Sequence, residues 1–216
     1  MRKLVLAAFL LAPGTTQAMQ GPEIPPMSDD EIRADLKDGE EIEARVDGDM
    51  NGDGDIDTAW IVRGEDRRTL HVSLAVRGEY DAYHAPAGSM ELDAYPLGPA
   101  EMTVAKGVLL VKDLTGGTTA ISAAYRFRGE KAQPKMRLIG LDATLYSRTY
   151  AHDGAEMSWN LLTGDVIATK LKLVGSGENA TYDKSAVKRF KRPVKTWYLE
   201  STPNAEDSLD AAMHGK

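Results

Sequence analysis

Apolar and polar side chains alternate in several stretches of the chain, which is the pattern of β-strands with one buried face. The first stretch carries Ile42, Ala44 and Val46, each followed by a charged residue. Residues 70–76 repeat the alternation, with leucine or valine at every second position. Because successive side chains of a strand point to opposite faces, each stretch presents one apolar face to a core.

Further strand-like stretches follow and are separated by short turns. We expect strands at residues 41–46, 58–62, 70–76, 102–112, 118–128, 135–146, 156–162 and 166–174. Residues 113–117 and 162–165 contain the threonine, glycine and aspartate typical of tight turns between neighbouring strands. No long amphipathic pattern separates these strands. The sequence therefore predicts a mainly β fold, an antiparallel meander that forms a sandwich or an open barrel.

Two segments depart from the strand pattern. Ser28, followed three residues later by Glu31, forms a capping box and predicts one short N-terminal helix that ends near Leu36. Residues 79–101 contain several prolines and glycines and three tyrosines, and predict a long excursion with little regular structure. Long loops of this kind often carry function in compact domains.

The first residues have the pattern of a secretory signal. Arg2 and Lys3 precede a short apolar run, and the small residues Thr16 and Ala18 follow it, so we expect cleavage after Ala18. The run is much shorter than the roughly 20 apolar residues that cross a bilayer as a helix. Residues 1–18 are therefore assigned to a signal peptide, and the mature chain is expected to be periplasmic or secreted, and not transmembrane.

Composition changes this picture in two ways. The chain has 216 residues, a net charge of −7 and no cysteine. Absence of cysteine excludes disulfides, thiolate metal sites and cysteine nucleophiles, and the acidic balance argues against nucleic acid as a partner.

We divide the chain after the signal peptide into an extended lead-in at 19–27, a single β-rich domain at 28–200 and a disordered tail at 201–216.

An aspartate- and glycine-rich segment between the first two expected strands carries the clearest chemistry. Calcium binds six to eight oxygen atoms, which alternate residues of a tightly wound loop can supply. Gly52 and Gly54 permit the positive φ angles that such winding requires. Four of the expected ligands act through side-chain oxygens and one, Asp55, through its backbone carbonyl. The expected ligands of a structural Ca²⁺ ion are Asp49, Asn51, Asp53, Asp55 and Asp57.

This segment is not an EF-hand. An EF-hand needs a glutamate at position 12 of the loop. Counting from Asp49 places Trp60 there, and counting from Asp47 places Thr58 there. The alternative to a calcium loop is a solvated turn without an ion, in which the crowded carboxylates would repel one another.

The pattern D-x-N-G-D-G-x-x-D, followed by an apolar strand, resembles the calcium loops of FG-GAP and VCBS-type repeats. The resemblance implies side-chain ligation by Asp49, Asn51, Asp53 and Asp57 and carbonyl ligation by Asp55. Those families repeat the loop around a β-propeller, whereas this sequence contains it once. Together with residues 137–142 and 160–166, the chain resembles uncharacterised proteobacterial periplasmic proteins. That resemblance implies no activity.

Candidate catalytic residues do not form a recognisable set. The four histidines, His71, His84, His152 and His214, stand in no known catalytic motif, so we assign no catalytic residue. We expect a calcium-binding interaction module, with an envelope protein, a saccharide or a surface as partner, rather than an enzyme. The alternative is a small periplasmic hydrolase that uses residues 79–101 as its cleft.

A basic run precedes the C-terminus. It is formed by Lys184, Lys188, Arg189, Lys191, Arg192 and Lys195. The simpler interpretation is a charged edge strand that resists aggregation. The other interpretation is contact with an anionic surface.

Overall fold

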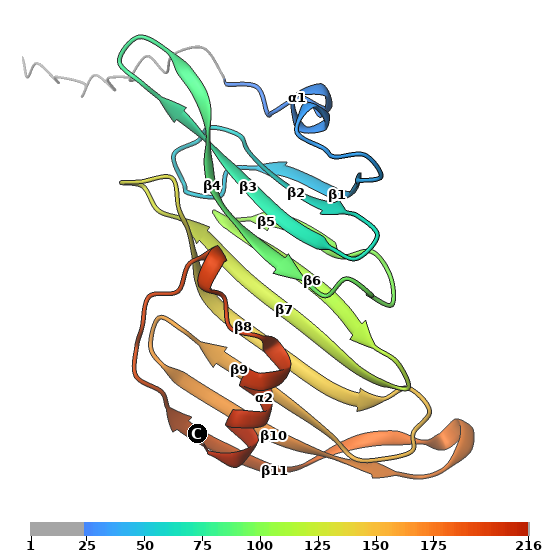
Figure 1. The fold of residues 1–216 in the computed structure, drawn as a ribbon. Helices are drawn as coiled ribbons and strands as arrows, with labels where there is room; N and C mark the ends of the chain where they lie inside the picture. The colour runs from blue at the N-terminus through green and yellow to red at the C-terminus, as the bar shows by residue number, and fades with distance from the viewer. Residues whose placement is uncertain (1–23, 216) are drawn as a thin grey trace, which may run out of the picture.

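The computed structural model describes residues 24–215, which form two antiparallel β-sheets and two α-helices (Figure 1). The mainly β prediction is confirmed. The expected signal peptide, residues 1–18, and most of the expected lead-in lie outside the described residues. Within the described chain, no helix is long and apolar enough to cross a membrane.

The smaller sheet has four strands in the order β1-β2-β3-β4. Their bounds are β1 (Glu41–Gly48), β2 (Asp57–Arg63), β3 (Arg68–Arg77) and β4 (Ala82–Leu92). Each strand pairs with the next one along the chain, in the antiparallel sense. The loop that carries the expected calcium ligands therefore connects two neighbouring strands, β1 and β2.

The larger sheet has seven strands in the order β11-β10-β9-β8-β7-β6-β5, again a simple meander. Their bounds are β5 (Glu101–Ala105), β6 (Val108–Gly116), β7 (Thr119–Gly129), β8 (Met136–Ser147), β9 (Gly154–Asn160), β10 (Asp165–Val174) and β11 (Thr181–Lys191). Neither sheet of the described chain closes on itself, because each has two different edge strands. A closed barrel is therefore excluded for this part of the chain.

The two sheets meet along β1 and β5. The approach is close, because a Cβ atom on Gly48 would lie only 2.9 Å from Val104 Cβ. One continuous apolar core extends across both sheets and includes Ile61 and Leu70 from the smaller sheet and Leu109 and Phe127 from the larger. The junction of the sheets is thus part of the core.

Helix α1 (Asp29–Ala34) confirms the predicted N-terminal helix, although it ends before Leu36. The capping box is present: the Glu31 amide donates to Ser28 Oγ at 3.2 Å, and the Ser28 amide donates to Glu31 Oε2 at 2.6 Å. Ile32 is the buried residue of this helix.

The expected irregular excursion is wrong in its centre, because residues 82–92 form strand β4. Pro86 has no N–H for a ladder, but β4 is an edge strand and needs partners on one side only. A register shift between Val72 and Ser73 places Ala87 as an extra residue in β4, next to Gly88, whose φ is +120°. Ala85, Ala87 and Met90 then point into the core.

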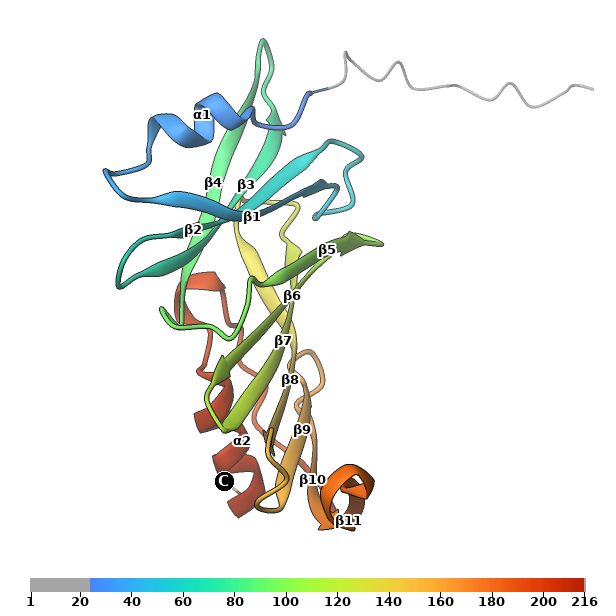
Figure 2. The same ribbon diagram turned by 90° about the vertical axis from the view of Figure 1, so that its right-hand side faces the viewer.

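The expected disordered tail is also wrong, because residues 205–214 form helix α2 (Ala205–His214). Asn204 caps it, accepting a hydrogen bond from the Asp207 amide at 3.0 Å. Leu209 and Ala212 are buried in the common core. Figure 2 shows α2 along one face of the seven-stranded sheet. Packing of its apolar face against this sheet stabilises the short helix.

Candidate calcium loop and the groove beside it

Asp57, the first residue of β2, ties the loop to the smaller sheet. Its side chain is fully buried, although it is an acid. Oδ2 accepts a hydrogen bond from the Met50 amide at 2.7 Å, and Oδ1 accepts one from the Ala75 amide at 2.9 Å. One carboxylate therefore joins the start of the loop to strand β3.

The environment of Asp57 is electrostatically unfavourable for its charge. Burial, together with the negative charges of Asp53 and Asp49, raises the pKa of Asp57 to about 6, although its two amide hydrogen bonds lower it. The charges of Asp49 and Asp53 therefore disfavour the ionised form of Asp57, and a cation beside Asp57 would offset this effect.

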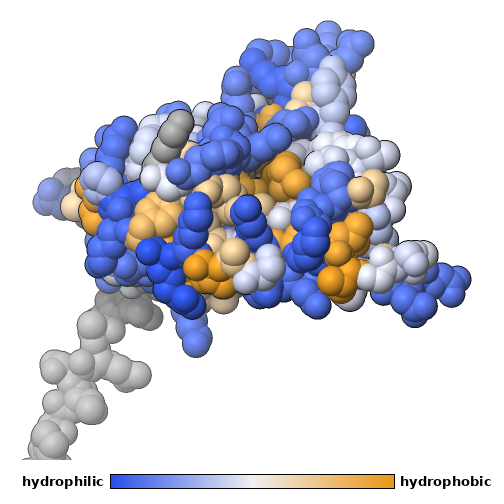
Figure 3. All heavy atoms as spheres, turned by 90° about the horizontal axis from the view of Figure 1, so that it is seen from below, coloured by the Kyte–Doolittle hydropathy of each residue, from blue (hydrophilic) through white to orange (hydrophobic). Residues whose placement is uncertain are grey.

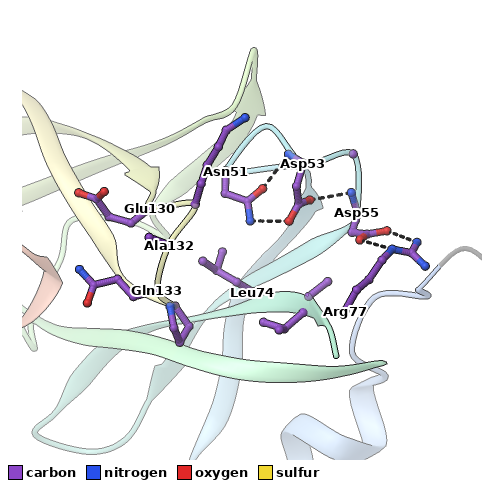
Figure 4. Close-up of a pocket in the computed structure, with 13 residues that line it drawn as sticks. Asn51, Asp53, Asp55, Leu74, Arg77, Glu130, Ala132 and Gln133 are labelled. Atoms are coloured by element: carbon purple, nitrogen blue, oxygen red, sulfur yellow. Dashed lines mark hydrogen bonds and ion pairs between the residues drawn. The ribbon is translucent and has the colours of Figure 1, made fainter. Parts of the chain in front are cut away.

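The remaining oxygen donors organise the loop through short-range hydrogen bonds. Asp49 accepts hydrogen bonds from the Gly52 amide at 2.5 Å and the Gly54 amide at 3.1 Å. Asn51 Oδ1 accepts from the Asp53 amide at 2.9 Å, and Asn51 Nδ2 donates to Asp53 Oδ2 at 2.7 Å (Figure 4). Both glycines have positive φ, +78° and +93°, as the tight winding requires.

Asp55 is oriented differently from the other acids. Its carboxylate forms two contacts with Arg77 at the end of β3, Nε to Oδ2 at 2.8 Å and Nη2 to Oδ1 at 2.5 Å (Figure 4). The side chain is thus engaged outside the loop. This arrangement is compatible with the expectation that Asp55 contributes a carbonyl oxygen to a metal ion.

The structure brings the five predicted ligands into one loop without arranging their carboxylates around a common centre. Across residues 24–215, no three Asp, Glu or His side chains come together in a way that could hold a metal ion by themselves. A calcium site here would also draw on the Asn51 amide oxygen and the Asp55 carbonyl. The chemistry of the donors fits calcium, which prefers carboxylate and carbonyl oxygens.

A groove of about 740 Å³ lies directly beside the loop (Figure 4). Asn51 and residues 53–55 form one wall, residues 74–77 of β3 a second, and residues 130–134 of the β7–β8 turn a third. Its lining mixes charged and amide groups with small apolar side chains. The first two walls belong to the smaller sheet and the third to the larger, so the groove spans the junction of the sheets.

Sequence reasoning did not find Met50, Arg77 or the β7–β8 turn as parts of this region. Met50 offered a signal, because it is the one large apolar residue between Asp47 and Asp55 and is fully buried. The contributions of Arg77 and of residues 130–134 depend on tertiary contacts and leave no local pattern.

A second group of charges is buried between the sheets. Arg68 is fully buried and donates to both oxygens of Glu43, at 2.6 and 2.7 Å, and to both oxygens of Asp113, at 3.2 and 2.9 Å. Burial alone would raise the pKa of Glu43, but hydrogen bonds from Arg68 and from the Ala100 amide outweigh it and lower the pKa. The cluster links β1 and β3 of the smaller sheet to β6 of the larger sheet, so it stabilises the junction of the sheets.

The histidines form no catalytic arrangement among the described residues. His71 stacks on Trp60 with ring centroids 5.4 Å apart, and burial lowers its pKa. His84 Nε2 donates to the backbone carbonyl of Pro25 at 2.9 Å. His152 contacts the Thr119 hydroxyl and a backbone carbonyl. His214 lies in the last turn of α2, which is exposed.

Most of the basic C-terminal run has partners within the chain. Lys184 pairs with Glu156 and Lys191 with Asp165, while Lys188 donates to the Met213 carbonyl at the end of α2. The run forms the edge strand β11 and the segment after it, which suits the interpretation as a charged, aggregation-resistant edge. Figure 3 views the molecule from below and shows apolar surface divided by hydrophilic side chains.

The fold and the loop give no family assignment. We compared the chain with protein-family models, with curated proteins and with solved structures, and none of the three comparisons gave a match.

Proposed function

We propose that this protein is an exported calcium-binding module whose loop between β1 and β2 holds a structural Ca²⁺ ion. One observation carries the proposal: five residues with oxygen donors lie within nine positions of the chain, and the carboxylate of one of them, Asp57, is fully buried. Export to the periplasm or secretion follows from the signal-like pattern of residues 1–18.

The ligands would be Asp49, Asn51, Asp53 and Asp57 through side-chain oxygens and Asp55 through its carbonyl. Hydrogen bonds from loop amides do not prevent this, because each carboxylate oxygen has more than one lone pair. Bound calcium would supply the positive charge that the mutually repelling carboxylates lack. The ion would thereby stabilise the folded loop.

The groove beside the loop is the surface that we propose for a partner, an envelope protein or a saccharide. Arg77, Lys131, Glu130 and Gln133 offer donors and acceptors of both charges, and Leu74 offers an apolar contact. Binding sites commonly combine an apolar lining with a few polar groups in this way.

A calcium titration followed by thermal melting tests the proposal. For a dissociation constant of about 0.1–1 mM, ~10 mM calcium would stabilise the fold by roughly 1.4–2.7 kcal/mol. The melting temperature should then rise by about 3–10 °C in a chain of this size. Magnesium at equal ionic strength should have a smaller effect, because Mg²⁺ demands near-ideal octahedral geometry.

The matched variants are Asp53→Ala, which removes an expected ligand, and Asp66→Ala, which removes an exposed acid from the β2–β3 turn. The first should lose most of the calcium-dependent shift, and the second should keep it. A wild-type melting temperature that does not change up to ~10 mM calcium would contradict the proposal, as would an equal shift in Asp53→Ala.

A further inference from the structure

The loop lies where the two sheets meet, and its backbone contacts the larger sheet directly. Met50 is fully buried in the common core. Its carbonyl oxygen accepts a hydrogen bond from the amide of Gly129, the last residue of β7, at 2.8 Å. Lys131 Nζ donates to the Gly52 carbonyl at 3.3 Å. One donor at the end of β7 and one in the β7–β8 turn therefore hold the loop.

Packing at this contact leaves little free space. A Cβ atom on Gly129 would lie 2.7 Å from Asn51 Cβ, which is closer than side chains approach. Closely packed protein interiors transmit a displacement to neighbouring atoms, because they contain little free space to absorb it. A movement of the loop therefore requires a movement of the end of β7, and the reverse is also true.

A continuous chain of hydrogen bonds links the sheets through the loop. The Ala75 amide of β3 donates to Asp57, which also accepts from the Met50 amide. The Met50 carbonyl in turn accepts from Gly129 of β7. The residue that the Asp57 carboxylate positions is thus the same residue that contacts the larger sheet.

The groove depends on this link, because its walls come from both sheets. Residues 53–55 and 74–77 belong to the smaller sheet and its loop, whereas residues 130–134 follow Gly129 directly. Separation at the Met50–Gly129 contact would move the third wall away from the other two. The shape of the groove therefore depends on whether the loop keeps its contact with Gly129.

We infer that the loop is a calcium-dependent fastener of the two sheets, and that its occupancy controls whether the groove is formed. The inference rests on the proposed calcium binding. With the ion bound, the loop holds the Met50–Gly129 and Gly52–Lys131 contacts and the groove is closed on three sides. Without the ion, repulsion among the loop carboxylates loosens these contacts and the β7–β8 turn moves away.

Hydrogen exchange on the full chain, with and without calcium, tests the inference. Exchange of the Gly129 amide should slow on addition of calcium by between about 5-fold and 150-fold, the usual range of coupling between two sites. The Arg192 amide, which donates to the Gly164 carbonyl at the far end of the larger sheet, is the control. It should slow far less, which separates local fastening from general stabilisation.

Reciprocity gives a second readout, because anything that opens the contact must weaken calcium binding by the same factor. Gly129→Ala should raise the calcium dissociation constant several-fold, because its Cβ would displace Asn51 as well as the end of β7. Gly98→Ala is the matched control, since a Cβ there meets nothing within 4 Å. Lys131→Ala, an exposed substitution that keeps the packing, should also weaken calcium binding and serves if Gly129→Ala does not fold.

The outcomes are distinct. Calcium-dependent protection at Gly129, with weaker binding in the Gly129 or Lys131 variant, supports the fastener. Calcium binding measured by calorimetry, with unchanged Gly129 exchange and with the wild-type affinity in Lys131→Ala, overturns the fastener and leaves the proposed calcium binding intact. No calcium binding in the millimolar range overturns both.

Discussion

Replacement of Arg68 by methionine is the sharpest test of how the two sheets are held together away from the loop. Arg68 is fully buried and its guanidinium donates four hydrogen bonds to two carboxylates, with a fifth to the Asp93 carbonyl at 3.0 Å. The side chains of Glu43 and Asp113 are only 4% and 5% exposed. Methionine would leave both acids buried without a counter-charge.

The expected cost follows from this geometry. Removal of one partner from a buried ion pair destabilises a protein by about 3–5 kcal/mol, and here one guanidinium serves two acids, so we expect the upper part of that range at neutral pH. Total stability is typically about 5–15 kcal/mol, so the variant should fold but with a small margin. Urea unfolding followed by tryptophan fluorescence measures the difference.

The pH dependence gives an independent check. In the wild type, the pKa of Glu43 is lowered, so its contribution is present above its unfolded pKa and is lost as the pH falls through the lowered folded pKa. In Arg68→Met, burial without the guanidinium raises the pKa of Glu43, so protonation of Glu43 at mildly acidic pH relieves the penalty. The difference between the two proteins should therefore shrink as the pH falls from 7 toward 5.

The control is the triple variant Arg68→Met, Glu43→Leu and Asp113→Leu, which replaces the whole cluster by apolar side chains. It should recover much of the lost stability, because apolar replacement of a buried ion cluster is often near neutral. A cost below ~1 kcal/mol for Arg68→Met at pH 7, or a cost independent of pH, would refute the reasoning.

Two further predictions concern helix α2. Leu209→Ala removes a fully buried side chain from the core between α2 and the larger sheet, and should lower the free energy of unfolding by about 2–5 kcal/mol in urea titrations. Asn204→Ala removes the N-cap of the same helix and should cost roughly 1 kcal/mol, whereas Asn204→Asp should keep the wild-type value. Equal stability of Leu209→Ala and the wild type would mean that α2 does not pack as described.

Local sequence patterns were sufficient for most of the strands and for the first helix. Period-two alternation anticipated most strands, because a half-buried strand places every second side chain in the core regardless of its neighbours. The capping box at Ser28 anticipated α1, since both of its hydrogen bonds form within four residues. The composition of the loop likewise placed Asp49, Asn51 and Asp53 in one tightly wound turn.

The single strand expected at 102–112 is wrong, because a turn at Lys106 and Gly107, both with positive φ, divides it into β5 and β6. The wrong predictions for residues 79–101 and 201–216 have a common physical cause. Pro86 and Gly88 disfavour a strand locally, yet β4 gains a full ladder from β3 and needs none on its other side. The segment from Ala205 is short and polar by itself, and helices of this length are marginal in water without packing. In both cases a tertiary partner decided the structure of a segment whose local preference was weak.

The sequence by itself determined a mainly β chain, a capped first helix and one loop rich in oxygen donors. Tertiary structure alone decided that this loop lies at the junction of two sheets. It also decided that Asp57 is buried against β3 and that Gly129 and Lys131 approach from the other sheet. The physical reason is range: alternation, caps and turns act over a few residues, whereas the Met50–Gly129 contact joins positions that only the packing of two complete sheets brings together.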